Sequence, residues 1–119
     1  LEREHEDWIT KSAEAGIGTV IRGGVAKGER EAGSRGAERY QTFEDAGLDE
    51  LREEGESRTA FMLRFTLSHP DLHTTIVGTQ NPDHLKENVA AAKRGALSAE
   101  VYAEAKRRLA KAGQMPAPE

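Results

Sequence analysis

The sequence VGTQNPDHLKEN, at residues 77–88, decides the fold. Asn81–Pro82 is a strong helix start, because an Asn side chain can accept from an unpaired helix N–H and a Pro at the first helical position has no N–H. The predicted helix continues to about Lys93. The preceding residues His73–Val77 are rich in β-formers and are closed by Gly78, which is typical of a short strand. A strand end, a tight turn and a helix N-terminus therefore follow one another here.

This turn has the features of an anion-binding site. Unpaired N–H groups and the positive end of the helix attract a phosphate, and Thr79 can add a hydroxyl donor. His84 and Asn88 share one helix face, because their spacing is i, i+4. The alternative is that Thr79 and Asn81 merely cap a surface helix, which is a common arrangement. The residues of the turn alone leave both interpretations open.

Upstream of this stretch, the sequence predicts a helix, a strand and a loop. Residues 2–15 carry acidic side chains at their start and a modest apolar stripe, which indicates a helix that Gly16 ends. Ile17–Ile21 is short and β-branched, which suits a strand covered on both faces, as in a parallel sheet. Residues 22–56 are glycine-rich and charged, so we expect a long mobile loop with a short helical turn around residues 48–53.

Two further helices flank the strand and helix at residues 73–93. Ser57 or Thr59 can cap the first, which contains the most apolar segment of the chain, must be buried, and is stopped by Pro70. The second opens at Leu97–Ser98 and has one apolar and one charged face. Residues 114–119 are expected to form a disordered tail.

This order of helices and strands predicts an α/β fold with right-handed crossovers and a parallel sheet. Two strands are too few, because a parallel pair leaves two open edges and cannot cover the apolar helix. Either further strands come from elsewhere, or the chain associates with a partner.

Composition limits the classes of function. Of the 119 residues, 36% are hydrophobic and 5% are aromatic, which indicates a thin core. Charged residues make up 32% with both signs mixed and a net charge of −4, so no basic face favours nucleic acid. The chain has no cysteine, and its apolar runs are far shorter than the roughly 20 residues that span a membrane. We therefore expect a cytoplasmic protein with neither nucleic acid nor membrane as a partner.

Several ordered segments are similar to the closing part of aldo/keto reductases. These segments are LRFTLSHP at 63–70, TIVGT at 75–79 and HLKEN at 84–88. Residues 1–6 and 16–28 also resemble the family's sixth helix and its seventh barrel strand with the following loop, whereas residues 29–56 match most weakly. The resemblance implies that residues 1–113 are the C-terminal portion of a TIM-type (β/α)8 barrel, helix-rich with two parallel strands.

The resemblance also implies a dinucleotide cofactor, NADP(H), at the carboxyl ends of the two strands. By residue-level match, Thr79 and Asn81 lie by the adenosine 2′-phosphate, while Glu87–Asn88 faces the adenine. Arg22 matches the position that stacks under the nicotinamide, and the backbone of residues 24–28 lies along the pyrophosphate. The implied cofactor-binding residues are Arg22, Gly24, Val25, Ala26, Gly28, Gly78, Thr79, Asn81, His84, Glu87 and Asn88.

His84 departs from the family pattern, because many members place an Arg over the 2′-phosphate at this position. A neutral imidazole holds a dianion less well than a bidentate guanidinium does. NAD(H) is therefore an open alternative to NADP(H).

No catalytic residue is assigned, because the Asp, Tyr, Lys and His of catalysis in this family come from earlier strands and no segment here matches them. Tyr102 lies on the apolar stripe of the last helix, and Tyr40 lies in a charged loop without a partner Lys motif. His69 and His73 have i, i+4 spacing, but Pro70 breaks the helix that would bring them together, so we assign no metal site.

The resemblance implies cofactor binding within an oxidoreductase that reduces aldehydes or ketones by hydride transfer from NADPH. We expect the chain to be a fragment or truncated copy of such an enzyme, partnered by the missing barrel half and inactive alone. Two alternatives stay open. One is a barrel remnant that self-associates through its exposed strands as an interaction module, and the other is a pseudoenzyme that binds nucleotide without turnover.

Overall fold

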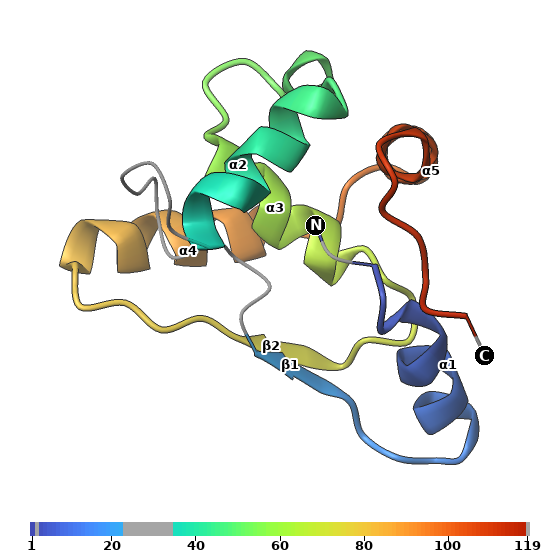
Figure 1. Ribbon diagram of the computed structural model, residues 1–119. Helices are drawn as coiled ribbons and strands as arrows, with labels where there is room; N and C mark the ends of the chain where they lie inside the picture. The colour runs from blue at the N-terminus through green and yellow to red at the C-terminus, as the bar shows by residue number, and fades with distance from the viewer. Residues whose placement is uncertain (2, 23–34, 119) are drawn as a thin grey trace.

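The computed structural model describes residues 1, 3–22 and 35–118 (Figure 1). Its elements are α1 (Glu6–Glu14), β1 (Val20–Arg22), α2 (Arg35–Asp45), the 3-10 helix η1 (Leu48–Leu51), α3 (Arg58–Leu67), β2 (Thr74–Ile76), α4 (Pro82–Arg94) and α5 (Ala99–Lys111). The two predicted strands are present, although each is shorter than expected. The helices predicted outside residues 22–56 are also present, and α1 begins later than predicted.

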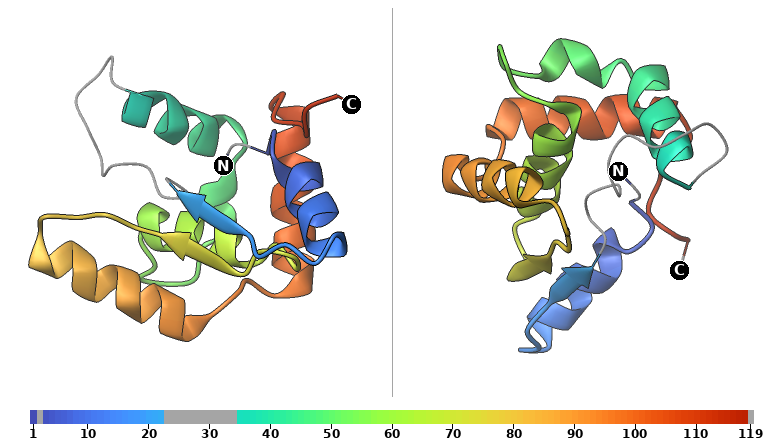
Figure 2. Two further views of the ribbon diagram at one scale, coloured as in Figure 1. Left: turned by 90° about the horizontal axis from the view of Figure 1, so that it is seen from below. Right: turned by 90° about the vertical axis from the view of Figure 1, so that its left-hand side faces the viewer.

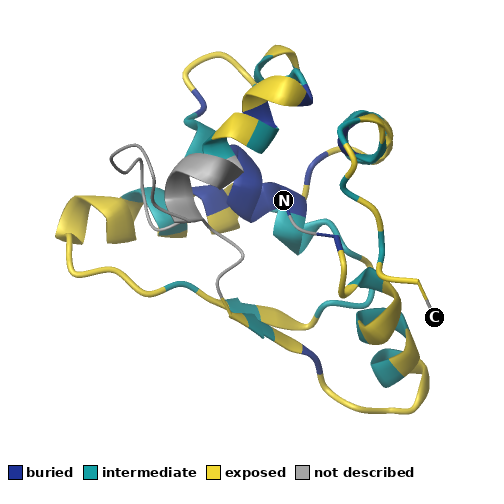
Figure 3. Cartoon of the chain, viewed as in Figure 1, coloured by how far each residue is buried: buried dark blue, intermediate teal, exposed yellow. Residues whose placement is uncertain are grey.

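The two strands form a parallel sheet in which Val20 lies opposite Thr74 and Arg22 lies opposite Ile76. The predicted parallel pairing is therefore confirmed. The prediction that β1 is covered on both faces is wrong, because Val20 is 56% exposed and Arg22 is also exposed; Ile76, opposite Arg22 on β2, is 55% exposed. These side chains share one face of the sheet, and among the described elements no strand or helix covers that face (Figure 3).

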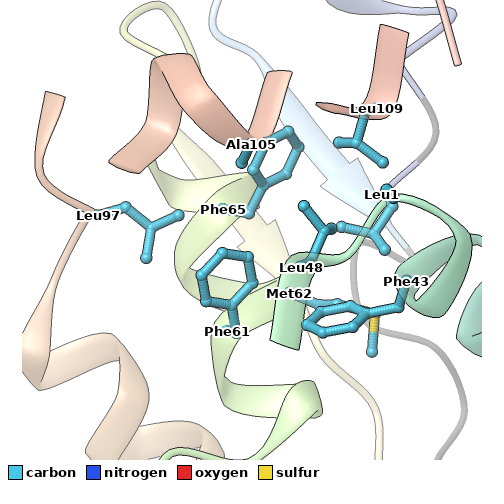
Figure 4. Close-up of a cluster of buried hydrophobic side chains, with 10 residues drawn as sticks. Leu1, Phe43, Leu48, Phe61, Met62, Phe65, Leu97, Ala105 and Leu109 are labelled. Atoms are coloured by element: carbon cyan, nitrogen blue, oxygen red, sulfur yellow. The ribbon is translucent and has the colours of Figure 1, made fainter. Parts of the chain in front are cut away.

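The main core surrounds α3, as the apolar composition of this helix predicts. Phe61 is fully buried and meets Phe43 edge to face, with ring centroids 5.6 Å apart. The ring of Phe65 packs against that of Tyr102 on α5, with centroids 5.2 Å apart, as expected for a residue on the apolar stripe of this helix. The buried members of this cluster are Leu1, Phe43, Ala46, Leu48, Phe61, Met62, Phe65, Leu97, Ala105 and Leu109 (Figure 4).

Helix α2 was not predicted, and the interpretation of residues 22–56 as a loop is wrong for residues 35–45. The charged, glycine-interrupted sequence gives little local preference for a helix. Phe43 is fully buried and Ala46, just past the helix, is 7% exposed, so the helix is stabilised by packing against the core. The predicted helical turn near residues 48–53 is observed as η1, with Leu48 buried.

The helix starts follow the predicted caps. The Ser57 hydroxyl accepts from Ala60 N–H at 3.0 Å, and the Ser98 hydroxyl accepts from Val101 N–H at 3.2 Å. Of the two candidate caps for α3, the structure therefore uses Ser57. Each cap satisfies a donor that would otherwise lack a partner in the first turn.

The C-terminal segment is hydrogen-bonded to the N-terminal segment, in contrast to the predicted disordered tail. Ala117 N–H donates to the Glu4 carbonyl at 3.2 Å. The Arg3 guanidinium donates to the carbonyls of Gln114 at 3.2 Å and Lys106 at 3.3 Å. Residues 114–117 therefore close over the start of the chain beside α5.

Candidate functional site

The candidate site begins at the carboxyl ends of the two strands, which lie at the same edge of the sheet because the strands are parallel. Arg22 is the last residue of β1 and lies directly opposite Ile76, the last residue of β2. From β2 the chain runs through an exposed turn into α4, whose N-terminal end points away from the rest of the molecule (Figures 1 and 2). Arg22 and this turn therefore lie at the same end of the sheet.

Local hydrogen bonds fix the turn between Gly78 and α4. The Asn81 N–H donates to the Thr79 hydroxyl oxygen at 3.1 Å, and the Asn81 side-chain carbonyl accepts from Asp83 N–H at 2.9 Å. The Thr79 O–H lies 3.5 Å from the Asn81 carbonyl, which is long for an O–H···O hydrogen bond. Asn81 therefore caps the helix and Thr79 holds the cap residue in place, while the exposed Thr79 hydroxyl has, among the described residues, only this long contact for its own proton.

The side chains predicted to meet the nucleotide lie open to solvent. Gly78, Thr79, Asn81 and His84 are all exposed, and Glu87–Asn88 is half-buried one turn further along α4. No packed protein from the described part of the chain covers the helix start (Figure 3). A ligand phosphate can therefore approach the positive end of the helix directly.

Charges of both signs lie near the helix start, and their effects on a bound phosphate oppose one another. Asp83 lies in the first turn and Lys86 lies one turn later, with the ammonium 3.2 Å from the Asp83 carboxylate. Both side chains are strongly exposed, at 84% for Asp83 and 79% for Lys86, so water screens them. The Asp83 carboxylate repels a phosphate, and the Lys86 ammonium together with the helix dipole attracts one.

Helix α4 is held against α3 at its C-terminal half. Ala91 is buried against Ala60 and Leu63, while Leu67 and Val77 pack at the edge of this small cluster. Beyond the helix, the Arg64 guanidinium of α3 donates to the carbonyls that follow α4. The turn carrying the candidate residues is therefore presented by a helix anchored at its opposite end.

Four predicted residues, Gly24, Val25, Ala26 and Gly28, lie outside the described residues. Of the remaining predicted residues, the structure groups Gly78, Thr79, Asn81 and His84 around the start of α4. Arg22 is exposed on the same sheet face as Ile76.

The tyrosines and histidines outside this site have structural partners. Burial, and secondarily the negative charge of Glu6, raises the pKa of Tyr102 to about 12. The Tyr40 hydroxyl is hydrogen-bonded to a threonine hydroxyl at 3.0 Å. His69 Nδ1 accepts from a backbone N–H at 3.2 Å, and His73 Nδ1 accepts from Thr19 N–H at 3.0 Å. Across residues 1, 3–22 and 35–118, no group of three His, Cys, Asp or Glu residues is placed to hold a metal ion.

The Thr19–His73 link was missed by the sequence analysis. Besides its N–H contact to the imidazole, Thr19 donates its hydroxyl proton to the Asp71 carbonyl at 2.7 Å and accepts from His73 N–H at 3.1 Å. The residues before β1 and β2 are thereby joined at the amino ends of the strands. No sequence signal marks this pair, because its residues are 54 positions apart.

The sequence and the fold of the chain are both similar to those of known proteins. The model of the Aldo/keto reductase family matches residues 2–109. The holo form of the aldo-keto reductase AKR11C1 from Bacillus halodurans matches with 25% identity and a TM-score of 0.66, over 91% of this chain and 38% of that chain. Its apo form matches with 24% identity and a TM-score of 0.69, over 91% of this chain and 40% of that chain. A search of curated proteins gives no significant match.

The chain spans about two fifths of the length of these two structures. Its fold is that of a C-terminal portion of a TIM-type barrel, helix-rich with two parallel strands, as predicted. In the part of the chain that the structure describes, no helix is long and apolar enough to cross a membrane. Since the family model covers nearly the whole sequence, from before α1 into α5, the chain belongs to the aldo/keto reductase family.

Proposed function

We propose that this chain is the cofactor-binding C-terminal part of an NADP(H)-dependent aldo/keto reductase. The observation that carries the proposal is the exposed turn from Gly78 into α4, which is fixed by its own hydrogen bonds at the carboxyl edge of two parallel strands. TIM-type barrels bind ligands at that edge, frequently with a phosphate near the last strands. The adenosine 2′-phosphate would lie at the start of α4.

Different residues of the site would bind different parts of the nucleotide. Thr79 supplies a hydroxyl donor to the 2′-phosphate, and the first-turn N–H groups of α4 supply the positive end of the helix dipole. Glu87–Asn88, on the next turn of α4, would hydrogen-bond the adenine. Arg22 at the end of β1 would stack under the nicotinamide, and the backbone of residues 24–28 would follow the pyrophosphate.

Preference for the 2′-phosphate is expected to be moderate. His84 stands where a guanidinium would make two hydrogen bonds to the phosphate, and Asp83 beside it is acidic. Lys86 offsets part of the Asp83 charge. NADP(H) should therefore bind better than NAD(H), but by less than in a member with an Arg at this position.

The chemistry of such an enzyme is reduction of an aldehyde or ketone, in which bound NADPH supplies a hydride and a protein group supplies a proton. No residue of this chain matches the family's proton donor or its Lys partner. We therefore propose that the chain binds nucleotide without reducing carbonyl compounds. Turnover would need residues from the earlier strands of a barrel.

Titration of the pure chain with NADPH, followed by nicotinamide fluorescence, tests the proposal. We expect saturable binding that Asn88→Ala weakens, and no NADPH oxidation when an aldehyde is added. Lack of binding would contradict the cofactor site. Aldehyde-dependent NADPH oxidation by the pure chain would contradict the proposal that the chain binds nucleotide without reducing carbonyl compounds.

A second candidate function, self-association, is favoured by the open sheet. Val20 and Ile76 are more than half exposed on one face, and Ile17 before β1 is 60% exposed. Apolar side chains beside unpaired strand edges promote pairing with another chain. Analytical ultracentrifugation of the wild type and of Val20→Lys distinguishes self-association from cofactor binding. A symmetric dimer that the substitution dissociates and that shows no nucleotide binding would favour this candidate.

A further inference from the structure

Arg64 carries a charge in the most buried segment of the chain. It lies on α3 between Leu63 and Phe65, and only 6% of the residue is exposed. Burying a guanidinium costs several kcal/mol unless its donors are matched by acceptors. The partners of Arg64 therefore indicate what the buried charge does.

The Arg64 guanidinium connects three segments. Nη1 donates to Glu53 at 2.9 Å and to Glu56 at 2.7 Å, both in the segment before α3. Nε donates to the Gly95 carbonyl at 3.0 Å, and Nη2 donates to the Ala96 carbonyl at 3.2 Å. One side chain of α3 thus holds the preceding loop and the turn that follows α4.

The acceptors are themselves fixed. Glu56 is 2% exposed, and its second carboxylate oxygen accepts from Glu53 N–H at 3.1 Å. Arg94, the last residue of α4, is ion-paired with Glu53 and lies 3.7 Å from the Glu56 carboxylate. The hydrogen bond from Arg64, together with the positive charges of Arg64 and Arg94, holds the pKa of Glu53 below its usual range. We refer to Glu53, Glu56, Arg64 and Arg94 as the Arg64 cluster.

A second link reaches the same turn. The Ser68 hydroxyl donates to the Arg64 carbonyl at 2.6 Å and accepts from Leu97 N–H at 2.8 Å. Gly95 and Ala96 follow the last residue of α4, where no further helical turn supplies donors, and Arg64 donates to both of their carbonyls. The C-terminal end of α4 is therefore tied to α3 by charge and by hydrogen bonds.

The N-terminal end of α4 has no comparable anchor among the described residues. Residues 82–86 are all exposed, and Ala91 is the buried residue of the helix. A helix of 13 residues is about 20 Å long, so a tilt of about 5° at its anchored end moves the other end by almost 2 Å. A displacement of about 1 Å is enough to spoil a ligand-binding geometry.

We propose that Arg64 is a positioning residue, which sets the direction of α4 through the Arg64 cluster and so places the nucleotide-binding turn at its far end. The effect on α4 depends only on the contacts above. The effect on the cofactor rests on the proposed function.

Residual dipolar couplings of the backbone amides in the full chain test the proposal, with NADPH affinity measured in parallel. The variants are Glu56→Gln, which keeps the side-chain shape, and Arg64→Lys, which keeps the charge but loses the planar donor set. Glu104→Gln is the matched control, because it removes a half-buried carboxylate that pairs with arginines on α5, away from α3 and α4. We expect both test variants to keep α3 and α4 helical, to turn α4 relative to α3, and to bind NADPH about threefold to thirtyfold more weakly.

The control should leave the direction of α4 and the NADPH affinity unchanged. An unchanged α4 direction in a folded test variant would overturn the proposal. If both variants unfold, the direction of α4 is measured in Arg94→Gln instead. Arg94 is the more exposed arginine of the cluster, so its replacement disturbs the core less. If the wild type binds no NADPH, the proposed function fails, while the direction of α4 still decides the role of Arg64.

Discussion

Replacing Asn81 by Asp separates helix capping from phosphate binding. The Asn81 side chain accepts from Asp83 N–H at 2.9 Å, and an Asp carboxylate can accept the same hydrogen bond. Asn and Asp are equally good caps, and a negative charge at a helix N-terminus is favourable by about 0.3–1 kcal/mol. The nearby Asp83 carboxylate opposes part of that gain. The free energy of unfolding should therefore change by less than about 1 kcal/mol.

The same substitution places a negative charge where the phosphate is expected. A phosphate at the positive N-terminal end of α4 would lie about 5 Å from the new carboxylate. Coulomb's law in a medium like water gives about 1.7 kcal/mol of repulsion between one charge and a dianion at that distance. The affinity for NADPH should therefore fall roughly tenfold to twentyfold at low salt. NADH has no 2′-phosphate, so its affinity should not fall.

Isothermal titration with NADPH and NADH, together with urea unfolding, measures both effects. Asp83→Asn is the matched control, because it removes a charge beside the same N–H groups and should strengthen NADPH binding. Equal losses for NADPH and NADH in Asn81→Asp, or no loss for either, would refute the placement of the 2′-phosphate. A large loss of stability would refute the capping argument.

Three further predictions concern the fold. Phe61→Ala removes a fully buried ring and its contact with Phe43, so urea unfolding should show a loss of about 3–5 kcal/mol; a loss below 1 kcal/mol would contradict the core. Thr19→Val removes the hydroxyl that joins the residues before the two strands, and the free energy of unfolding should fall by about 1–3 kcal/mol. His73→Gln should lower it less, because the Gln side-chain oxygen can still accept from Thr19 N–H. Hydrogen bonds from two arginines lower the pKa of Glu104 from 4.5 to about 2, so its contribution to stability is present above pH 4.5 and is lost as the pH falls toward 2. NMR titration of the Glu104 carboxyl should show this depressed pKa, and a normal value would contradict the pairing.

Local chemistry explains which parts of the fold could be predicted. The start of α4 follows from Asn81–Pro82, and the start of α3 follows from Ser57, because each cap acts within three residues. Helix α2 could not be predicted in this way, since it depends on burying Phe43 against Phe61 of a later helix. The exposed face of the sheet was also missed, because β-branched residues predict a strand but do not show what covers it.

The candidate site was predictable to a similar extent. The turn around Asn81 was identified from its sequence, and the structure places it in the open at the carboxyl edge of the sheet. The Arg64 cluster was not predicted, because its members come from three segments that only the folded chain brings together. A single Arg inside an apolar segment was the available signal, since a buried charge requires partners.

The most direct test uses adenosine 2′,5′-bisphosphate, with adenosine 5′-monophosphate as the control that lacks the 2′-phosphate. Amide chemical shifts of the full chain should move saturably at residues 78–84 with the bisphosphate and much less with the monophosphate. Shifts of equal size with both nucleotides, or no saturable shift at residues 78–84, would contradict the claim that the turn into α4 holds the adenosine 2′-phosphate.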